Sequence, residues 1–116
     1  MVQLAGHIKS KCGTNTVVIV FHEYEALEYH PPRCRYLSAQ YHRDQVVEIL
    51  ENLSKKNQKV LVTDTSIRYV LGPTIERLGL KTIEIARFEI DPQVETEQHI
   101  IVLYELQPAN SLSQRP

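Results

Sequence analysis

Hydrophobic residues recur along this chain at two different spacings, which predicts alternating strands and helices. Four short stretches are rich in β-branched residues or alternate between apolar and polar side chains, and these predict strands. They are residues 16–22, 59–63, 81–86 and 99–106. The first two are apolar on both faces, which is typical of strands in the centre of a sheet.

Two longer stretches place their apolar residues on one helical stripe. The first covers 38–54, and Ser38 at its start is a suitable N-cap. The second covers 64–79 and ends at Gly79, a residue type that suits a helix C-cap. Within it, Pro73 has no N–H to donate to the carbonyl four residues back, so we expect a kink or break at Gly72-Pro73. Shorter helical segments are predicted over 2–11 and 23–29.

These elements predict an α/β fold, a small three- to four-stranded sheet, mainly parallel, with helices packed on it. The strand, helix and strand over 59–86 predict a right-handed βαβ unit. The 116 residues suffice for one domain with its own core. We expect that domain over 1–106, followed by a polar, Pro-bounded tail over 107–116.

Composition and charge narrow the function classes. Hydrophobic residues make up 42% and charged residues 23%, which excludes a disordered chain. No stretch approaches the ~20 apolar residues of a membrane span, and no secretory signal is visible, so we expect a cytoplasmic protein with reduced thiols. A net charge of −1 makes nucleic acid an unlikely partner. Residues 31–60 are basic and 81–105 acidic, which we interpret mainly as two solvated faces.

Side chains that could bind a metal are densest between residues 22 and 42. Imidazole, thiolate and carboxylate groups together could hold zinc, and the candidate ligands are His22, His30, Cys34 and His42. Their spacing matches no zinc motif, since the run from His22 lacks the second histidine of H-E-x-x-H. Scattered surface histidines explain the pattern better, so we expect no metal and no other cofactor. A small metal-dependent enzyme or hydrolase using this cluster stays as the alternative.

Two further segments contain residue types found in catalytic or ligand-binding sites, namely Cys34 with its neighbours and the turn after the second strand. Arg33 and Arg35 flank Cys34 and favour its thiolate, but a nucleophile also needs a base, and His30 and His42 qualify only by proximity in sequence. The turn Thr63-Asp64-Thr65-Ser66 lies where α/β folds bind ligands, yet Asp64 suits a helix cap better than a phosphate site.

Tyrosines and arginines are concentrated over residues 33–43. Such side chains stack on single-stranded nucleic acid or contact proteins, and the residues concerned are Arg33, Arg35, Tyr36, Tyr41 and Arg43. A protein contact is the better interpretation because the basic excess is small. Single-stranded nucleic acid stays as a weaker alternative.

The stretch 36–90 carries a pattern of apolar and charged residues. A strand ends in Leu-x-Thr, an Ile-Arg pair opens the next helix, and an Ile-Glu pair and a closing Glu-Ile follow. The residues concerned are Leu61, Thr63, Ile67, Arg68, Ile75, Glu76, Glu89 and Ile90. With this pattern, the stretch 36–90 resembles the last cytoplasmic subdomain of the export-gate proteins of flagellar and type III secretion systems. It departs from that family at Gly72-Pro73, where another basic residue is usual, and at Ile85-Ala86, where the family has Leu-Ser.

The resemblance implies a protein-transport function without catalysis. In that family the cytoplasmic domain assembles as a ring and receives export substrates and chaperones, so the expected partners are proteins or further copies of the chain. No catalytic residue is implied. The partner or subunit interface is then expected to use Arg68, Glu76, Glu89, Arg33, Arg35 and Tyr36. The membrane domain of the family is absent from this chain.

Overall fold

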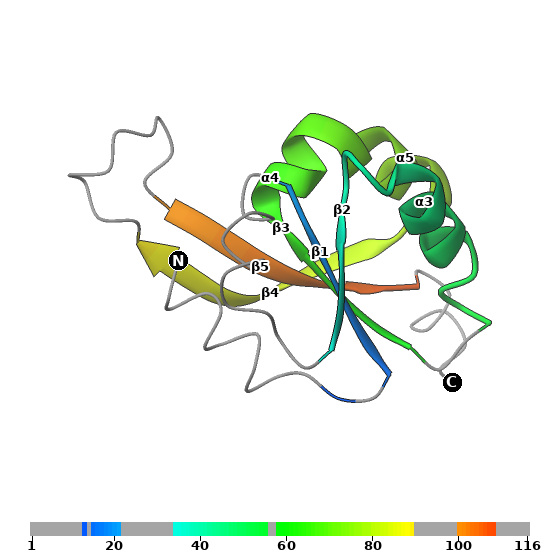
Figure 1. Ribbon diagram of the computed structural model, residues 1–116, viewed down its shortest axis with the longest axis horizontal. Coiled ribbons are helices and arrows are strands. Elements are labelled where there is room, and N and C mark those ends of the chain that lie inside the picture. Colours follow the sequence, from blue (N-terminus) through cyan, green and yellow to red (C-terminus); the bar gives the residue numbers. More distant parts are fainter. Residues whose placement is uncertain (1–12, 14, 22–33, 56–57, 90–99, 109–116) are drawn as a thin grey trace.

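The computed structural model describes residues 13, 15–21, 34–55, 58–89 and 100–108, which form one sheet with helices packed on it (Figure 1). In chain order the elements are β1 (Thr16–Val20), β2 (Arg35–Ser38), α3 (Arg43–Glu51), β3 (Lys59–Thr63), α4 (Asp64–Ser66), the π-helix η1 (Ile67–Leu71), α5 (Gly72–Leu78), β4 (Lys81–Glu89) and β5 (Ile100–Gln107). The predicted α/β class is confirmed, with five strands instead of three to four.

The sheet is mixed, with strand order β2-β1-β3-β5-β4. The central strand β1 runs parallel to both neighbours, so that Val18 lies opposite Tyr36 on one side and Leu61 on the other. In contrast, β5 is antiparallel to both β3 and β4. The two strands of the predicted βαβ unit, β3 and β4, therefore run in the same direction but do not pair, because β5 lies between them.

Strand β2 is absent from the sequence prediction, which begins a helix at Ser38. That residue instead ends β2, and its Oγ accepts hydrogen bonds from the backbone N–H groups of Gln40 at 3.2 Å and Tyr41 at 3.0 Å. The Ser38 hydroxyl thus stabilises a turn between strand and helix. The backbone N–H of Ser38 donates to Nδ1 of His42 at 2.9 Å, and α3 begins only at Arg43.

The helical segment after β3 contains the predicted interruption, which takes the form of the π-helix η1. The backbone N–H of Gly72 donates to the carbonyl of Ile67, five residues back, as a π-helix requires. Pro73 follows as one of the first residues of α5, where its missing N–H is tolerated. A Cβ on Gly72 would lie 3.0 Å from the Ile67 carbonyl oxygen, so this turn favours glycine.

Gly79 ends α5 in the left-handed conformation, with φ 65°, as its position predicts. Leu80 N–H donates to the Ile75 carbonyl at 3.1 Å and closes the cap. We expect Gly79→Ala to lower the free energy of unfolding by about 1 kcal/mol, because a Cβ is disfavoured at positive φ. Chemical denaturation measures this change. Gly79→Asn is the matched control and should retain most of the stability, since asparagine tolerates this conformation; equal stability of wild type and Gly79→Ala would contradict the explanation.

The sheet carries a buried cluster on each face. The helices all lie on one face (Figure 1), where they cover the larger cluster. Its buried members are Val17, Ile19, Leu37, Ala39, Val46, Leu50, Leu53, Val60, Val62, Leu71, Ile75 and Leu106. The smaller cluster lies on the face away from the helices and consists of Val18, Val20, Cys34, Leu61, Ile101 and Leu103. We call these the helix face and the outer face.

Other boundaries differ from the prediction by a few residues. β4 continues to Glu89, beyond the predicted end at 86, and β5 includes Gln107, which was expected in the tail. The predicted helical segments at 2–11 and 23–29 lie outside the described residues, as does the tail from 109 onwards. Within the described ranges, no helix is long and apolar enough to cross a membrane.

Candidate functional site: the carboxyl edge of the parallel strands

β1, β2 and β3 are parallel, so all three end at the same edge of the sheet, which we call the carboxyl edge. The chain leaves β1 towards β2 on one side, whereas it leaves β3 through the helices towards the opposite side of the sheet. The boundary between β1 and β3 is therefore a topological switch point, the place where open α/β sheets bind ligands.

Three buried hydroxyl groups follow β3 at this switch point and bond to one another. Thr63 Oγ1 lies 3.1 Å from Thr65 Oγ1 and 2.9 Å from Ser66 Oγ. Ser66 Oγ also donates to the Ile19 carbonyl of β1 at 3.4 Å. These side chains are at most 1% exposed. They join the start of the helical segment to β1 and β3, and their hydrogen-bonding capacity is used inside the fold.

The carboxylate of Asp64 takes a structural role different from the predicted helix cap. Its Oδ1 accepts the backbone N–H of Val102 at 3.2 Å, which joins the start of α4 to β5. No side chain caps α4, whose N-cap residue is Thr63. The turn over 63–66 therefore joins the helical segment to the neighbouring strands by hydrogen bonds, and the predicted side-chain cap is not formed.

Aromatic and cationic side chains lie at the carboxyl edge, within the part of the chain that the structure describes. The rings of Phe21, just after β1, and Tyr69 of η1 stack with centroids 5.5 Å apart and an angle of 29°. Arg68 Cζ lies 5.9 Å from the centre of the Tyr69 ring, within the range of a cation–π interaction. Tyr69 nevertheless leaves 55% of its surface exposed.

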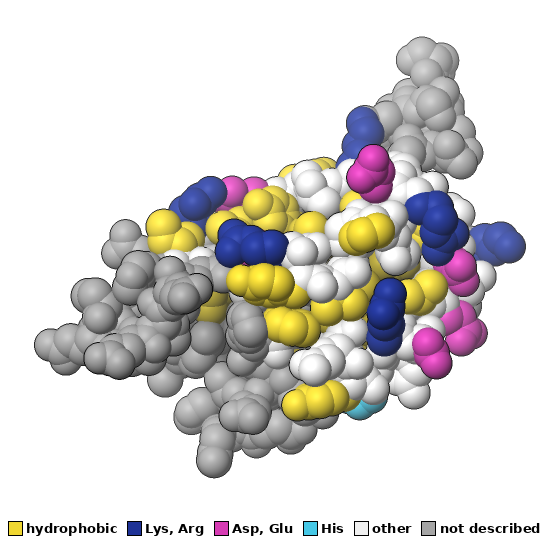
Figure 2. Space-filling view, turned by 90° about the horizontal axis from the view of Figure 1, so that it is seen from above, with side chains coloured by type: hydrophobic (Ala, Val, Ile, Leu, Met, Phe, Trp, Pro, Cys, Tyr) yellow, Lys and Arg dark blue, Asp and Glu magenta, His cyan; other side chains and the backbone are white. Residues whose placement is uncertain are grey.

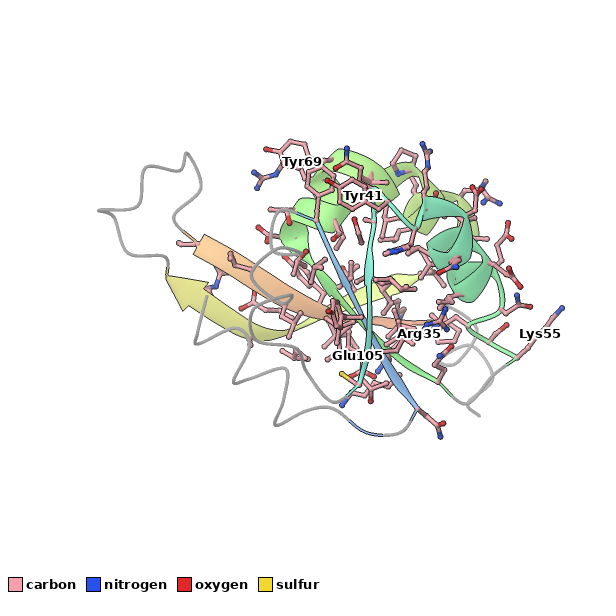
Figure 3. All side chains as sticks on the ribbon, in the orientation of Figure 1. Arg35, Tyr41, Lys55, Tyr69 and Glu105 are labelled. Carbon is pink, nitrogen blue, oxygen red and sulfur yellow. The ribbon has the colours of Figure 1, made fainter. Side chains whose placement is uncertain are left out.

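Tyr41 lies at the same edge. The Ala39 N–H donates to the Val20 carbonyl at 2.8 Å, which places the turn after β2 beside the end of β1. Tyr41, two residues further, is 67% exposed. Figure 3 shows Tyr41 and Tyr69 both above the ends of these strands, and Figure 2 shows exposed hydrophobic side chains interspersed with Lys and Arg on this side. We call Phe21, Tyr41, Arg68 and Tyr69 the carboxyl-edge surface.

A shallow hollow of about 400 Å³ adjoins this surface. It is lined by residues 40–45 alone, the turn after β2 and the first turn of α3. Because one continuous segment supplies the whole lining, no groups from separate elements converge there. This hollow has the shape of a contact surface more than that of an enclosed ligand site.

Of the six residues of the predicted interface, the four whose side chains the structure describes do not gather on one surface. Arg35 opens β2 and lies at the amino edge of the parallel strands, whereas Arg68 follows the carboxyl end of β3. Tyr36 is half-buried and packs against the outer-face cluster, and Glu76 is exposed on α5. Glu89 ends β4, and its side chain lies outside the described residues, as does Arg33.

The candidate metal ligands are described only in part, since His22 and His30 lie outside the described residues. Cys34 is disulfide-bonded and 8% exposed, so in this form it offers no thiolate, contrary to the expected reduced state. His42 uses Nδ1 to accept the Ser38 N–H. The described residues contain no group of three His, Cys, Asp or Glu that could hold a metal ion.

Phe21 and Tyr69 are the residues of this surface that the sequence prediction missed, and Tyr69 is the more exposed of the two. The helical spacing of Ile67, Val70 and Leu71 directs those side chains towards the core, which turns Arg68 and Tyr69 outwards. The periodicity of the apolar residues therefore contains the signal that could have predicted an exposed Tyr69 beside Arg68.

No known protein family, curated protein or solved structure matches this chain.

Proposed function

We propose that this protein is a non-enzymatic interaction module that binds a protein partner through the carboxyl-edge surface. The exposed Tyr69 beside Arg68, together with the exposed Tyr41 at the same edge of the sheet, carries this proposal. Tyr and Arg are enriched in the energetically dominant parts of protein interfaces, because they bury a large area at a small cost in side-chain entropy. The buried hydroxyls at the switch point bond within the fold, which supports binding over catalysis.

The resemblance of residues 36–90 to the export-gate cytoplasmic subdomain supports the same proposal. Arg68, which the resemblance implies as an interface residue, lies in the carboxyl-edge surface and is exposed. The proposed partners are accordingly proteins of an export apparatus, with cargo or chaperones as one class and neighbouring subunits as another. A cytoplasmic location and a role in protein transport belong to this proposal.

Charge reversal at Arg68 tests this proposal. We expect Arg68→Glu to reduce the recovery of cross-linked partner proteins from a lysate of the source cells by roughly tenfold, because it removes the cation beside Tyr69 and adds an anion. Quantitative mass spectrometry of the captured proteins measures the change. Lys55→Glu is the charge-matched control, since Lys55 is exposed in the loop after α3, away from the two tyrosines (Figure 3).

Equal loss of partners in both variants would assign the effect to net charge and contradict the proposal, as would unchanged capture by Arg68→Glu. A nucleic acid recovered with the wild-type protein, with affinity that falls steeply as salt rises, would instead favour the single-stranded nucleic-acid alternative.

A further inference from the structure

Among the described strands, β4 forms one edge of the sheet, with β5 as its neighbour on the other side (Figure 1). β4 spans Lys81–Glu89 and is the longest strand of the sheet. Ile83 leaves 42% of its surface exposed on this strand. A long edge strand with exposed apolar side chains is a template for pairing with another strand.

A bulge near the middle of β4 changes which residues share a face. The register passes from Glu84 opposite Tyr104 to Ala86 opposite Leu103, so Ile85 is the extra residue. Ile85 and Ala86 both pack against the outer-face cluster, although they are consecutive. Two neighbouring residues thus lie on one face at this point of the strand.

The faces of the other β4 residues follow from their partners in β5. Cross-strand partners share a face. Leu106 and Tyr104 belong to the helix face, Leu103 and Ile101 to the outer face, and side chains alternate along β5. Among the β4 residues whose side chains the structure describes, the register therefore assigns Thr82, Glu84 and Arg87 to the helix face, and Ile83, Ile85 and Ala86 to the outer face.

This arrangement is symmetric about the bond between residues 85 and 86. Ile85 and Ala86, on either side of this bond, lie on the outer face, and the next residues outwards, Glu84 and Arg87, lie on the helix face. A twofold axis through this point, perpendicular to the sheet, would pair β4 antiparallel with β4 of a second copy. Each of these four residues would then lie opposite one of the same face, with the two bulges side by side. A shift by one residue would mix the faces.

The side chains are complementary in this register. Glu84 would lie opposite Arg87 of the second copy, and Arg87 opposite its Glu84. Apolar residues of the outer face would also meet, since Ile85 would lie opposite Ala86. We propose that β4 is a self-association edge, through which two copies of this chain join their five-stranded sheets into a single ten-stranded sheet.

A salt bridge between Glu84 and Arg87 within one chain holds the two charges next to each other on the strand. Arg87 Nη2 lies 2.8 Å from Glu84 Oε1, and Arg87 Nε lies 3.3 Å from Oε2. This hydrogen bond raises the pKa of Arg87 above its ordinary value. Two such pairs across the axis form a group of four alternating charges. Charges and bulges usually protect edge strands from pairing, but here they are self-complementary, so they exclude other strands and admit a second copy.

A concentration series in the analytical ultracentrifuge tests this proposal. The wild-type chain of 13.4 kDa should reach twice that mass as its concentration rises. Glu84→Arg and Arg87→Glu should each weaken self-association by roughly 100-fold, because each places like charges opposite one another. An equimolar mixture of the two variants should associate again, since every facing pair is then of opposite charge. Glu84→Arg/Arg87→Glu, which exchanges the charges, should also associate.

The control is Glu76→Arg, the same charge change on an exposed residue of α5, which should leave self-association unchanged. Circular dichroism verifies folding, which the exposed positions of Glu84 and Arg87 should preserve. A wild-type protein that keeps the mass of a single chain at every concentration would overturn the proposal. So would undiminished association of both single variants, or a mixture that stays monomeric. β4 is separate from the carboxyl-edge surface, so this outcome and the partner-capture result are independent.

Discussion

Leu71→Ala is expected to lower the free energy of unfolding by about 3 kcal/mol, the largest effect among the substitutions considered. Leu71 is fully buried in the helix-face cluster, at the end of η1. Truncation removes its contacts with the cluster and leaves a cavity that the sheet below cannot fill without moving its backbone. Urea denaturation followed by circular dichroism measures the change as a lower midpoint with an unchanged slope.

Ile100→Ala is the control for Leu71→Ala. Ile100 is a large apolar residue of similar volume, but 38% of its surface is exposed at the start of β5. Its truncation should cost less than about 1 kcal/mol. A cost at Leu71 as small as that at Ile100 would show that the helical segment contributes little to the core.

Thr63→Val is expected to cost about 2 kcal/mol, although valine has nearly the same shape. The substitution removes the hydroxyl that bonds to both Thr65 and Ser66. Fully buried, those two hydroxyls lose a hydrogen-bonding partner that water cannot replace without opening the fold. Thermal unfolding monitored by circular dichroism should show a clearly lower midpoint.

Thr82→Val provides the matched control, because it makes the same change on an exposed strand residue. There the hydroxyl faces water, and the expected change lies within about 0.5 kcal/mol. A Thr63→Val protein as stable as the wild type would mean that the hydroxyl cluster at the switch point is not an important link between β1, β3 and the helix.

Local patterns predicted the parts of this fold that depend on neighbouring residues. The apolar runs of β1 and β3 specify buried strands, and the cap at Gly79 and the interruption at Gly72-Pro73 have local steric causes. Each of these features follows from the conformational limits of a few residues, so a single sequence is sufficient to find them.

Features that depend on distant pairing escaped the prediction. β2 has four residues, begins with Arg35 and owes its conformation to the ladder with β1. The insertion of β5 between β3 and β4 is equally invisible locally, since either order satisfies the same alternation of side chains. Ser38 shows the ambiguity at a single residue, because a serine hydroxyl that suits a helix N-cap also suits a turn after a strand.

The same distinction applies to the candidate site. Arg68 was found through a family pattern, whereas its association with Phe21 and Tyr69 arises where the end of β1 meets η1. The charge symmetry of β4 was also hidden, because Glu84 and Arg87 share a face only once the bulge at Ile85 is known.

The interior position of β5 determines the order in which this sheet can be completed. On the ribosome, β1, β2 and β3 emerge first and can form their parallel ladders, but β3 then presents an unpaired side until Ile100–Gln107 has been synthesised. β4 waits for the same segment, because β5 is its neighbour in the sheet. A nascent chain that stalls between Glu89 and Ile100 therefore leaves open the sides of β3 and β4 that β5 covers in the finished sheet, which makes it a substrate for chaperones or a nucleus for aggregation.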